Sequence, residues 1–233
     1  WNPILTIRAD PQSSESTPEE EEDARYLTNL LITPSGSADA VFWENSAKNF
    51  LEGLLLHVRT ASLGNSGNQS KVRERSMREV RRLLSLDQGS FQELLDEMSS
   101  SQRTLIKESA NNLNRIMGTM GESKTGLSIL AHLLEQTSVW SYQRLHRVTY
   151  KASETENDLE PAPNDFSFEQ LRDGNTSLYL IIPPDYLTEY RAVLRVMVGC
   201  AMRELRMSFV DHKKSLVPQQ KPPVLFILDE FPQ

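Results

Sequence analysis

The chain ends in the stretch Val224-Leu225-Phe226-Ile227-Leu228-Asp229-Glu230-Phe231-Pro232-Gln233. Its first five residues form an unbroken apolar run of strand length, which predicts a strand buried on both faces, as in a parallel sheet. Asp229 and Glu230 then fall at the carboxyl end of that strand, where open α/β sheets bind their ligands. Two interpretations stay open on these residues alone: a ligand site, or a core strand that ends in two solvated acids.

The pattern has the shape of a Walker B motif. In such a motif the first acid, here Asp229, holds Mg²⁺ directly or through water, because Mg²⁺ prefers oxygen ligands and keeps several of its waters. The second acid, here Glu230, orients and deprotonates the attacking water. The two residues are therefore candidate catalytic groups, with Asp229 also the candidate cofactor-binding and metal-binding residue.

A Walker B strand requires a Walker A loop that holds the phosphates. The nearest match is the stretch 118–125, which has Ser123 where the motif needs its second glycine and which follows no buried strand. We interpret it as a turn between two helices. We therefore expect a phosphate loop upstream of Trp1 in a longer protein, and we expect this chain alone to be inactive and to hold neither ATP nor Mg²⁺.

A second apolar run, Leu178–Ile182, predicts another buried strand, which Pro183 and Pro184 end. Asp185 can cap a long helix that carries apolar residues at helical spacing as far as Leu205. A strand, a crossover helix and a strand form a βαβ unit, which is right-handed in nearly all proteins. Because two strands without the rest of their sheet expose apolar faces and open edges, we expect this part to be partly ordered, packed on the helical domain or self-associating.

The region that precedes the second apolar run, from Ala24 to Lys151, is predicted to be helical throughout. No segment from Ala24 to Lys151 has the alternation of a strand, and the apolar residues recur at helical spacing. The domains are predicted as a tie or linker at 1–23, with a mobile acidic connector at 10–23, an all-helical domain at 24–160 and a partial α/β domain at 161–233. The helices are expected at 24–31, at 39–58 as the long spine, at 71–86, after a capping box of Ser90 and Glu93, at 105–117, at 127–136 and at 139–148.

Charge and composition narrow the function classes. The 233 residues carry a net charge of −7, which argues against strong nucleic-acid binding by bulk electrostatics, so we expect weak or no direct DNA binding. The single cysteine, Cys200, excludes an internal disulfide and is expected to be buried in the core. The four histidines show no metal-ligand spacing.

One basic segment is a candidate partner-binding surface. It could contact nucleic acid or an acidic partner, or it could be a solvated helix face with ion pairs four residues apart. The second interpretation is favoured because no aromatic side chains lie among the charges to stack on bases. The candidate residues are Arg73, Arg75, Arg78, Arg81 and Arg82, with a weaker cluster at Arg144, His146, Arg147 and Lys151.

The order of these parts resembles the TraG/TraD-like coupling proteins of type IV secretion and bacterial conjugation. The resemblance spans nearly the whole chain, and the combination and order of its blocks make it specific. The matching blocks are Trp1-Asn2-Pro3-Ile4, Asp23-Ala24-Arg25-Tyr26-Leu27, Phe42-Trp43-Glu44-Asn45-Ser46-Ala47-Lys48, Ser177-Leu178-Tyr179-Leu180-Ile181-Ile182-Pro183 and Leu228-Asp229-Glu230-Phe231-Pro232.

The resemblance implies a mainly α chain, in which an all-helical domain is inserted in a RecA-like α/β nucleotide-binding domain represented only by a βαβ piece. It implies a parent protein anchored at the bacterial inner membrane that assembles as a homo-hexameric ATPase on the cytoplasmic side, uses ATP and Mg²⁺, and delivers relaxase-bound DNA or effector proteins to the other components of the secretion channel. It assigns the Walker B roles to Asp229 and Glu230. The helical domain is then either a cargo-recognition module or a purely structural part of the ring.

Overall fold

The computed structural model describes residues 1–13, 16–34, 36, 40–63, 69–118, 124–150, 166–214 and 222–227, with side chains of the last helix described as far as residue 207. Over these residues the chain is mainly helical, as predicted. The α-helices are α1 (Pro18–Leu31), α2 (Val41–Thr60), α3 (Met77–Leu84), α4 (Gln88–Ser99), α5 (Thr104–Met117), α6 (Lys124–Gln136), α7 (Gln143–Thr149) and α8 (Leu187–Lys214). The short 3-10 helices are η1 (Pro3–Thr6), η3 (Ser138–Ser141), η4 (Phe168–Arg172) and η5 (Pro184–Tyr186).

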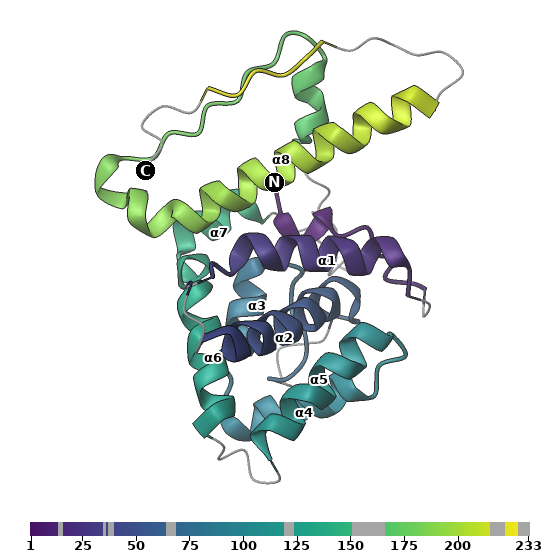
Figure 1. Ribbon diagram of the computed structural model, residues 1–233, viewed down its shortest axis with the longest axis vertical. Coiled ribbons are helices and arrows are strands. Elements are labelled where there is room, and N and C mark those ends of the chain that lie inside the picture. The colour runs from purple at the N-terminus through teal and green to yellow at the C-terminus, as the bar shows by residue number, and fades with distance from the viewer. Residues whose placement is uncertain are drawn as a thin grey trace.

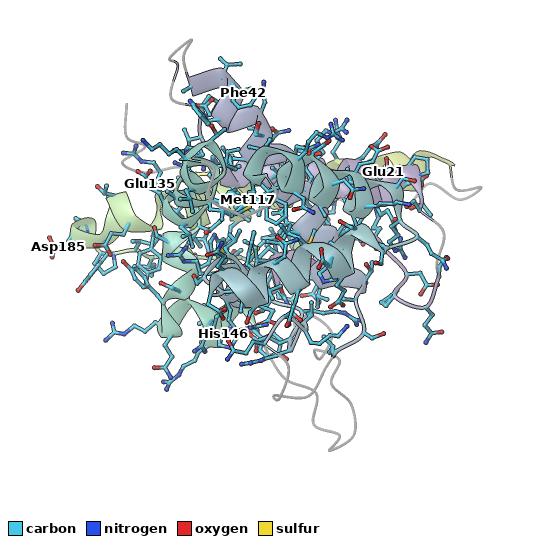
Figure 2. The ribbon with its side chains drawn as sticks, turned by 90° about the horizontal axis from the view of Figure 1, so that it is seen from below. Glu21, Phe42, Met117, Glu135, His146 and Asp185 are labelled. Carbon is cyan, nitrogen blue, oxygen red and sulfur yellow. The ribbon has the colours of Figure 1, made fainter. Side chains whose placement is uncertain are left out.

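Helix α2 is the spine of the helical body, as its apolar pattern predicts. It packs against α1, α5 and α6, and in Figure 1 it lies between α1 on one side and α4 and α5 on the other. Its central residues, among them Phe50, Leu51 and Leu54, are almost wholly buried. Met117 at the end of α5 lies near the middle of the view in Figure 2, whereas Phe42 in the first turn of α2 projects outward and is 55% exposed. The core is thus built around one helix that other helices surround.

A close crossing holds α2 against α5. A Cβ atom added to Gly53 of α2 would overlap the hydroxyl oxygen of Ser109 in α5, so only glycine lets the two backbones approach this far. Helix α5 then ends at Gly118, whose φ of 73° lies in the left-handed region that favours glycine. Because α5 ends at Met117 and Lys124 begins α6, the stretch 118–125 follows one helix directly and ends in the first turn of the next; residues 119–123 lie outside the described residues.

The amino-terminal segment is more ordered than the expected connector. The turn η1 buries Ile4, and α1 begins at Pro18, six residues before the predicted start. Thr17 caps α1 by accepting a hydrogen bond from the Glu20 backbone N–H, and the acidic run provides the negative charges that stabilise a helix amino end. Residues 18–23 therefore belong to the helical body.

Other helix starts also differ from the prediction. The basic segment becomes helical only at Met77, where Ser76 accepts a hydrogen bond from the Glu79 N–H at 3.1 Å. Helix α4 is capped by Asp87, whose Oδ1 accepts from the backbone N–H groups of Gly89 and Ser90, and not by the predicted capping box of Ser90 and Glu93. A hydrogen bond from the Ser90 side chain, and then those from the backbone N–H groups of Ser90 and Gly89, lower the pKa of Asp87. The predicted helix at 139–148 divides into η3 and α7.

Helix α8 crosses the helical body on the side of α1 that faces away from α2 (Figure 1). Extended chain at 175–183 precedes it, and extended chain at 222–227 follows it; the two run in the same direction in Figure 1. The predicted strands are not formed in the described residues, since no backbone ladder joins the two segments there. A strand is defined by that ladder, so an apolar run alone was insufficient to place one. Across the described helices, none has the length and apolar character that a membrane crossing needs.

Candidate functional site

The two acids predicted to carry the chemistry, Asp229 and Glu230, lie outside the described residues. The chain that leads to them is described as far as Ile227. Phe226 packs against the core, whereas Leu225 is 81% exposed. The catalytic and Mg²⁺-binding roles of the two acids stay predictions. The described elements that precede them in the chain are the extended segments and α8.

The extended chain before α8 exposes its apolar side chains to solvent. Tyr179 is 80% exposed and Ile181 is 86% exposed, while Leu178 and Leu180 are each 40% exposed. The side chains on both sides of the extended chain are thus accessible to solvent. This is expected for a segment that, among the described residues, has no paired strand at its edges and no layer packed on its faces. This agrees with the expectation that the last part of the chain leaves apolar surface uncovered.

Helix α8 is fastened to the carboxyl end of α1 by Arg195. Its guanidinium donates to the backbone carbonyl oxygens of Leu30 and Leu31, the latter at 2.9 Å, and to the hydroxyl of Thr33. The last carbonyls of a helix have no partner within the helix. Arg195 therefore performs the capping that a glycine motif performs in many other helices.

A second fastening lies nearer the start of α1. Asp23 is 5% exposed and accepts hydrogen bonds from Arg203 of α8 and from Arg8, whose Nε lies 2.8 Å from Asp23 Oδ2. Arg203 also lies over the ring of Tyr26, with its Cζ atom 4.6 Å from the ring centroid. The Tyr26 hydroxyl donates to the carbonyl oxygen of Gly199 at 2.8 Å.

Between these fastenings the two helices touch directly. A Cβ atom added to Gly199 would lie 2.5 Å from Leu30 Cδ2, so the glycine allows the close approach. Cys200 beside it is buried, as predicted, and burial raises the pKa of its thiol to about 12. We define the α1–α8 joint as Asp23, Tyr26, Leu30, Arg195, Gly199 and Arg203.

The joint was not predicted as a site, although a signal for it stands in the sequence. Arg195, Gly199 and Arg203 are spaced by four residues, which places them along one face of a helix. Asp23 and Tyr26 on α1 belong to one of the blocks that carry the family resemblance. Two arginines on a helix normally indicate a solvent-exposed surface. The helix that they contact lies far earlier in the chain, since 165 positions separate Leu30 from Arg195, so the sequence did not indicate the contact.

The predicted basic surface is largely engaged within the chain. Arg75 is 2% exposed and donates to the Ala61 carbonyl oxygen. Arg82 pairs with Glu79 at 2.7 Å and also donates to the carbonyl oxygens of Gln69 and Lys71. Arg73 and Arg81 are half-buried, and Arg78 is the exposed member of the set. Partner binding by these residues stays a prediction, and the internal contacts of Arg75 and Arg82 give these two a structural role.

The weaker cluster is divided in the same way. Arg144 and Arg147 are exposed on α7, whereas Nε2 of His146 faces Glu74 Oε2 at 3.7 Å and its ring stacks on Tyr150. Lys151 lies outside the described residues.

A polar pocket of about 500 Å³ lies where α2 and α4 end and α5 begins. His57, 5% exposed, lines it, and its Nε2 has no hydrogen-bond partner among the described residues. Burial lowers the pKa of His57 to about 4, so the ring is neutral at physiological pH. Lys71 and Glu97 form an ion pair at 2.9 Å on the same wall.

Comparison with known proteins identifies the family. A profile of the family described as type IV secretory system conjugative DNA transfer matches residues 1–233, the whole chain. The chain belongs to this family. The resemblance inferred from the sequence blocks is thereby confirmed.

Curated members of the conjugative DNA transfer family are similar to the chain at low identity. The conjugal transfer protein TraG of Escherichia coli is 26% identical, over 100% of this chain and 33% of TraG. The type IV secretion system-coupling protein VirD4 of Bartonella quintana is 24% identical, over 93% of this chain and 30% of VirD4. The chain thus spans about a third of the length of these relatives. No solved structure gave a significant match.

Proposed function

We propose that the chain is the central part of a conjugative coupling protein, in which an all-helical domain interrupts a RecA-like ATPase domain. The family match over the whole chain carries this proposal. The course of the chain around α8 supports it, because two extended segments that run in the same direction flank one long helix, as in a strand–helix–strand unit. The uncovered apolar side chains of residues 178–181 are then the surface on which the remaining sheet would pack.

In this function Asp229 would hold Mg²⁺, which would neutralise charge on the phosphates of ATP, and Glu230 would orient and deprotonate the attacking water. The phosphate loop comes from chain upstream of Trp1. The parent protein forms a homo-hexamer on the cytoplasmic side of the inner membrane. It passes relaxase-bound DNA or effector proteins to the secretion channel.

The test is ATP turnover in a polypeptide that extends upstream through a phosphate loop. We expect Glu230→Gln to lower turnover at least a hundredfold while ATP binding remains, because the water loses its base but the phosphates keep their contacts. Glu189→Gln on the exposed side of α8 is the matched control and should leave turnover unchanged. Turnover that survives Glu230→Gln would remove the assignment.

For the helical domain we propose cargo recognition, with a purely structural role in the ring as the second candidate. The internal contacts of Arg75 and Arg82 favour the structural role, since these side chains are not free to meet a partner. Titration of the whole chain with purified relaxase or effector separates the two. Saturable binding supports recognition, and no binding leaves the domain as a structural part.

A further inference from the structure

The α1–α8 joint fixes one helix against the other along much of the length of α1. Its contacts occur near the start of α1 at Asp23, at Tyr26, and at the end of α1 at Leu30. On α8 the matching positions, Arg195, Gly199 and Arg203, follow each other at one-turn intervals. The register between the two helices is therefore specified at several separated points.

Sliding of α8 along α1 would break these contacts together. Movement away from Arg195 would leave the Leu30 and Leu31 carbonyl oxygens without their partner. Movement away from Arg203 would remove one of two arginine partners from the buried Asp23 carboxylate. The loss of a hydrogen bond to a charged group costs more free energy than the loss of a neutral one. A single displacement of α8 along α1 would break the Arg195 and Arg203 contacts at once, so both costs would add. We therefore expect the two helices to move together.

Helix α8 is also the last helix before the predicted nucleotide site in the chain. The chain that follows it leads to Asp229 and Glu230, and its described part places Phe226 against the core. Pro222 lies beside Gly174, with 4.0 Å between the proline Cγ and a Cβ added to the glycine. Since both extended segments adjoin α8 in the chain, we expect a displacement of α1 to reach them through α8.

We propose that Arg195 and Arg203 are positioning residues that couple the helical domain to the nucleotide site. Force or ligand binding at one of these two sites then changes the conformation or affinity of the other. The proposal rests on the proposed function of Asp229 and Glu230. It assigns no contact with nucleotide to the two arginines, which act through α8. Coupling of this kind is reciprocal, so nucleotide binding must alter α1 as much as α1 alters nucleotide binding.

The test compares Arg195→Gln and Arg203→Gln with Arg191→Gln, an exposed arginine one turn before Arg195 on the same helix. Hydrogen exchange is measured by mass spectrometry in the extended polypeptide, with and without Mg²⁺ and a non-hydrolysable ATP analogue. In the unmodified protein and in Arg191→Gln, we expect the analogue to slow exchange in both α8 and α1. In the joint variants the analogue should still slow exchange in α8, while the effect on α1 disappears and basal exchange at the carboxyl end of α1 rises about tenfold or more.

Tyr26→Phe provides a milder variant if the arginine variants fold poorly. It removes the hydroxyl that donates to Gly199 and keeps the ring under Arg203, so we expect a partial loss of the analogue's effect on α1. An analogue that binds and protects α8 but never α1 in the unmodified protein overturns the coupling. So does an effect on α1 that survives in all joint variants. An analogue that fails to bind at all contradicts the proposed ATPase function instead, so the two failures are distinguishable.

Discussion

His57 is a neutral imidazole held inside the end of α2, where Lys71 and Glu97 are the charged groups that act on its ring. Burial is the largest cause of its lowered pKa; Glu97 opposes the shift and Lys71 adds to it. Its Nε2 has no hydrogen-bond partner among the described residues.

We predict that this ring makes the chain less stable in acid. Between the ordinary histidine pKa of 6.5 and the folded value of about 4, the unfolded chain binds a proton that the folded chain does not. The stabilisation is therefore complete above pH 6.5 and falls as the pH decreases, by about 3 kcal/mol at pH 4. Urea unfolding at several pH values should show a steeper loss for the unmodified chain than for His57→Leu.

The difference between the two proteins is the informative quantity, because carboxylates elsewhere also titrate in this range. Above pH 7.5 the difference in free energy of unfolding should be constant, since the ring is then neutral in both states. Parallel pH profiles for the two proteins down to pH 4 would contradict the buried, neutral state of His57.

The sequence correctly predicted the environment of a residue where apolar neighbours determine its burial. It did so incompletely where hydrogen-bond partners distant in the sequence determine that environment. Cys200 was correctly placed in the core by its apolar neighbours. Arg75 and Arg82 belong to a segment that reads as a charged helix face, yet their hydrogen-bond partners include Ala61, Gln69 and Lys71, which lie outside α3. Carbonyl partners carry no side-chain signature, so the sequence could not show them.

At the scale of the elements, a buried ion pair docks the first turn of α1 onto the beginning of α5. Arg103 pairs with Glu20, and both side chains are at most 5% exposed. Arg103 also donates to the carbonyl oxygens of Asp10 and Ser13, each at 2.8 Å. One guanidinium thus fixes the amino-terminal segment, α1 and α5 together.

We predict that Glu20→Gln lowers the free energy of unfolding by about 3 kcal/mol, because it leaves a buried charge without its counter-ion. The double variant Glu20→Leu/Arg103→Met should be more stable than either single variant, because no lone charge then remains buried. Glu22→Gln, an exposed position on the same helix, is the control and should have little effect. A double variant no more stable than the singles in chemical unfolding would show that the pair is not the docking interaction.

This pair also explains one of the two largest errors in the predicted helix boundaries, the start of α1. The acidic run 19–22 reads as solvated chain, and only its second residue meets a buried partner, 83 positions away in the sequence. The long, strongly periodic helices α2, α5 and α6 were predicted within a few residues, because their apolar faces are continuous. The start of a helix depends on a single side-chain hydrogen bond. Asp87 and Ser90 are both residue types favoured at the N-cap, so the sequence could not show which of them caps α4.

On the scale of the whole molecule, the uncovered apolar side chains are concentrated on the extended segments that flank α8. Tyr179, Ile181, Leu225 and Ile227 are all at least 80% exposed. The sequence predicts that these apolar side chains are exposed, because its apolar runs identify them. It does not predict that the backbone ladder is missing, because the neighbouring segments decide whether a strand forms. The predicted catalytic pair lies beyond the described part of this region, so its geometry stays a prediction.

We predict that the chain self-associates through these segments, because extended apolar chain with open edges pairs readily with another copy. In sedimentation velocity, the mean sedimentation coefficient should rise with concentration. Ile181→Lys/Ile227→Lys should abolish the rise, whereas Val148→Lys, at a 68% exposed position on α7, should leave it in place. A rise that is equal in all three proteins would locate the contact elsewhere.

Capping of α1 by Arg195 also has a consequence for biosynthesis. The arginine is 165 residues downstream of the first carbonyl it caps, and a ribosome adds roughly 5–20 residues per second. Helix α1 therefore leaves the ribosome about 10–30 s before its carboxyl end can be completed. During that interval the nascent chain can pack α2 on one side of α1, while the other side, with Tyr26 and Leu30, stays open to water until translation delivers α8.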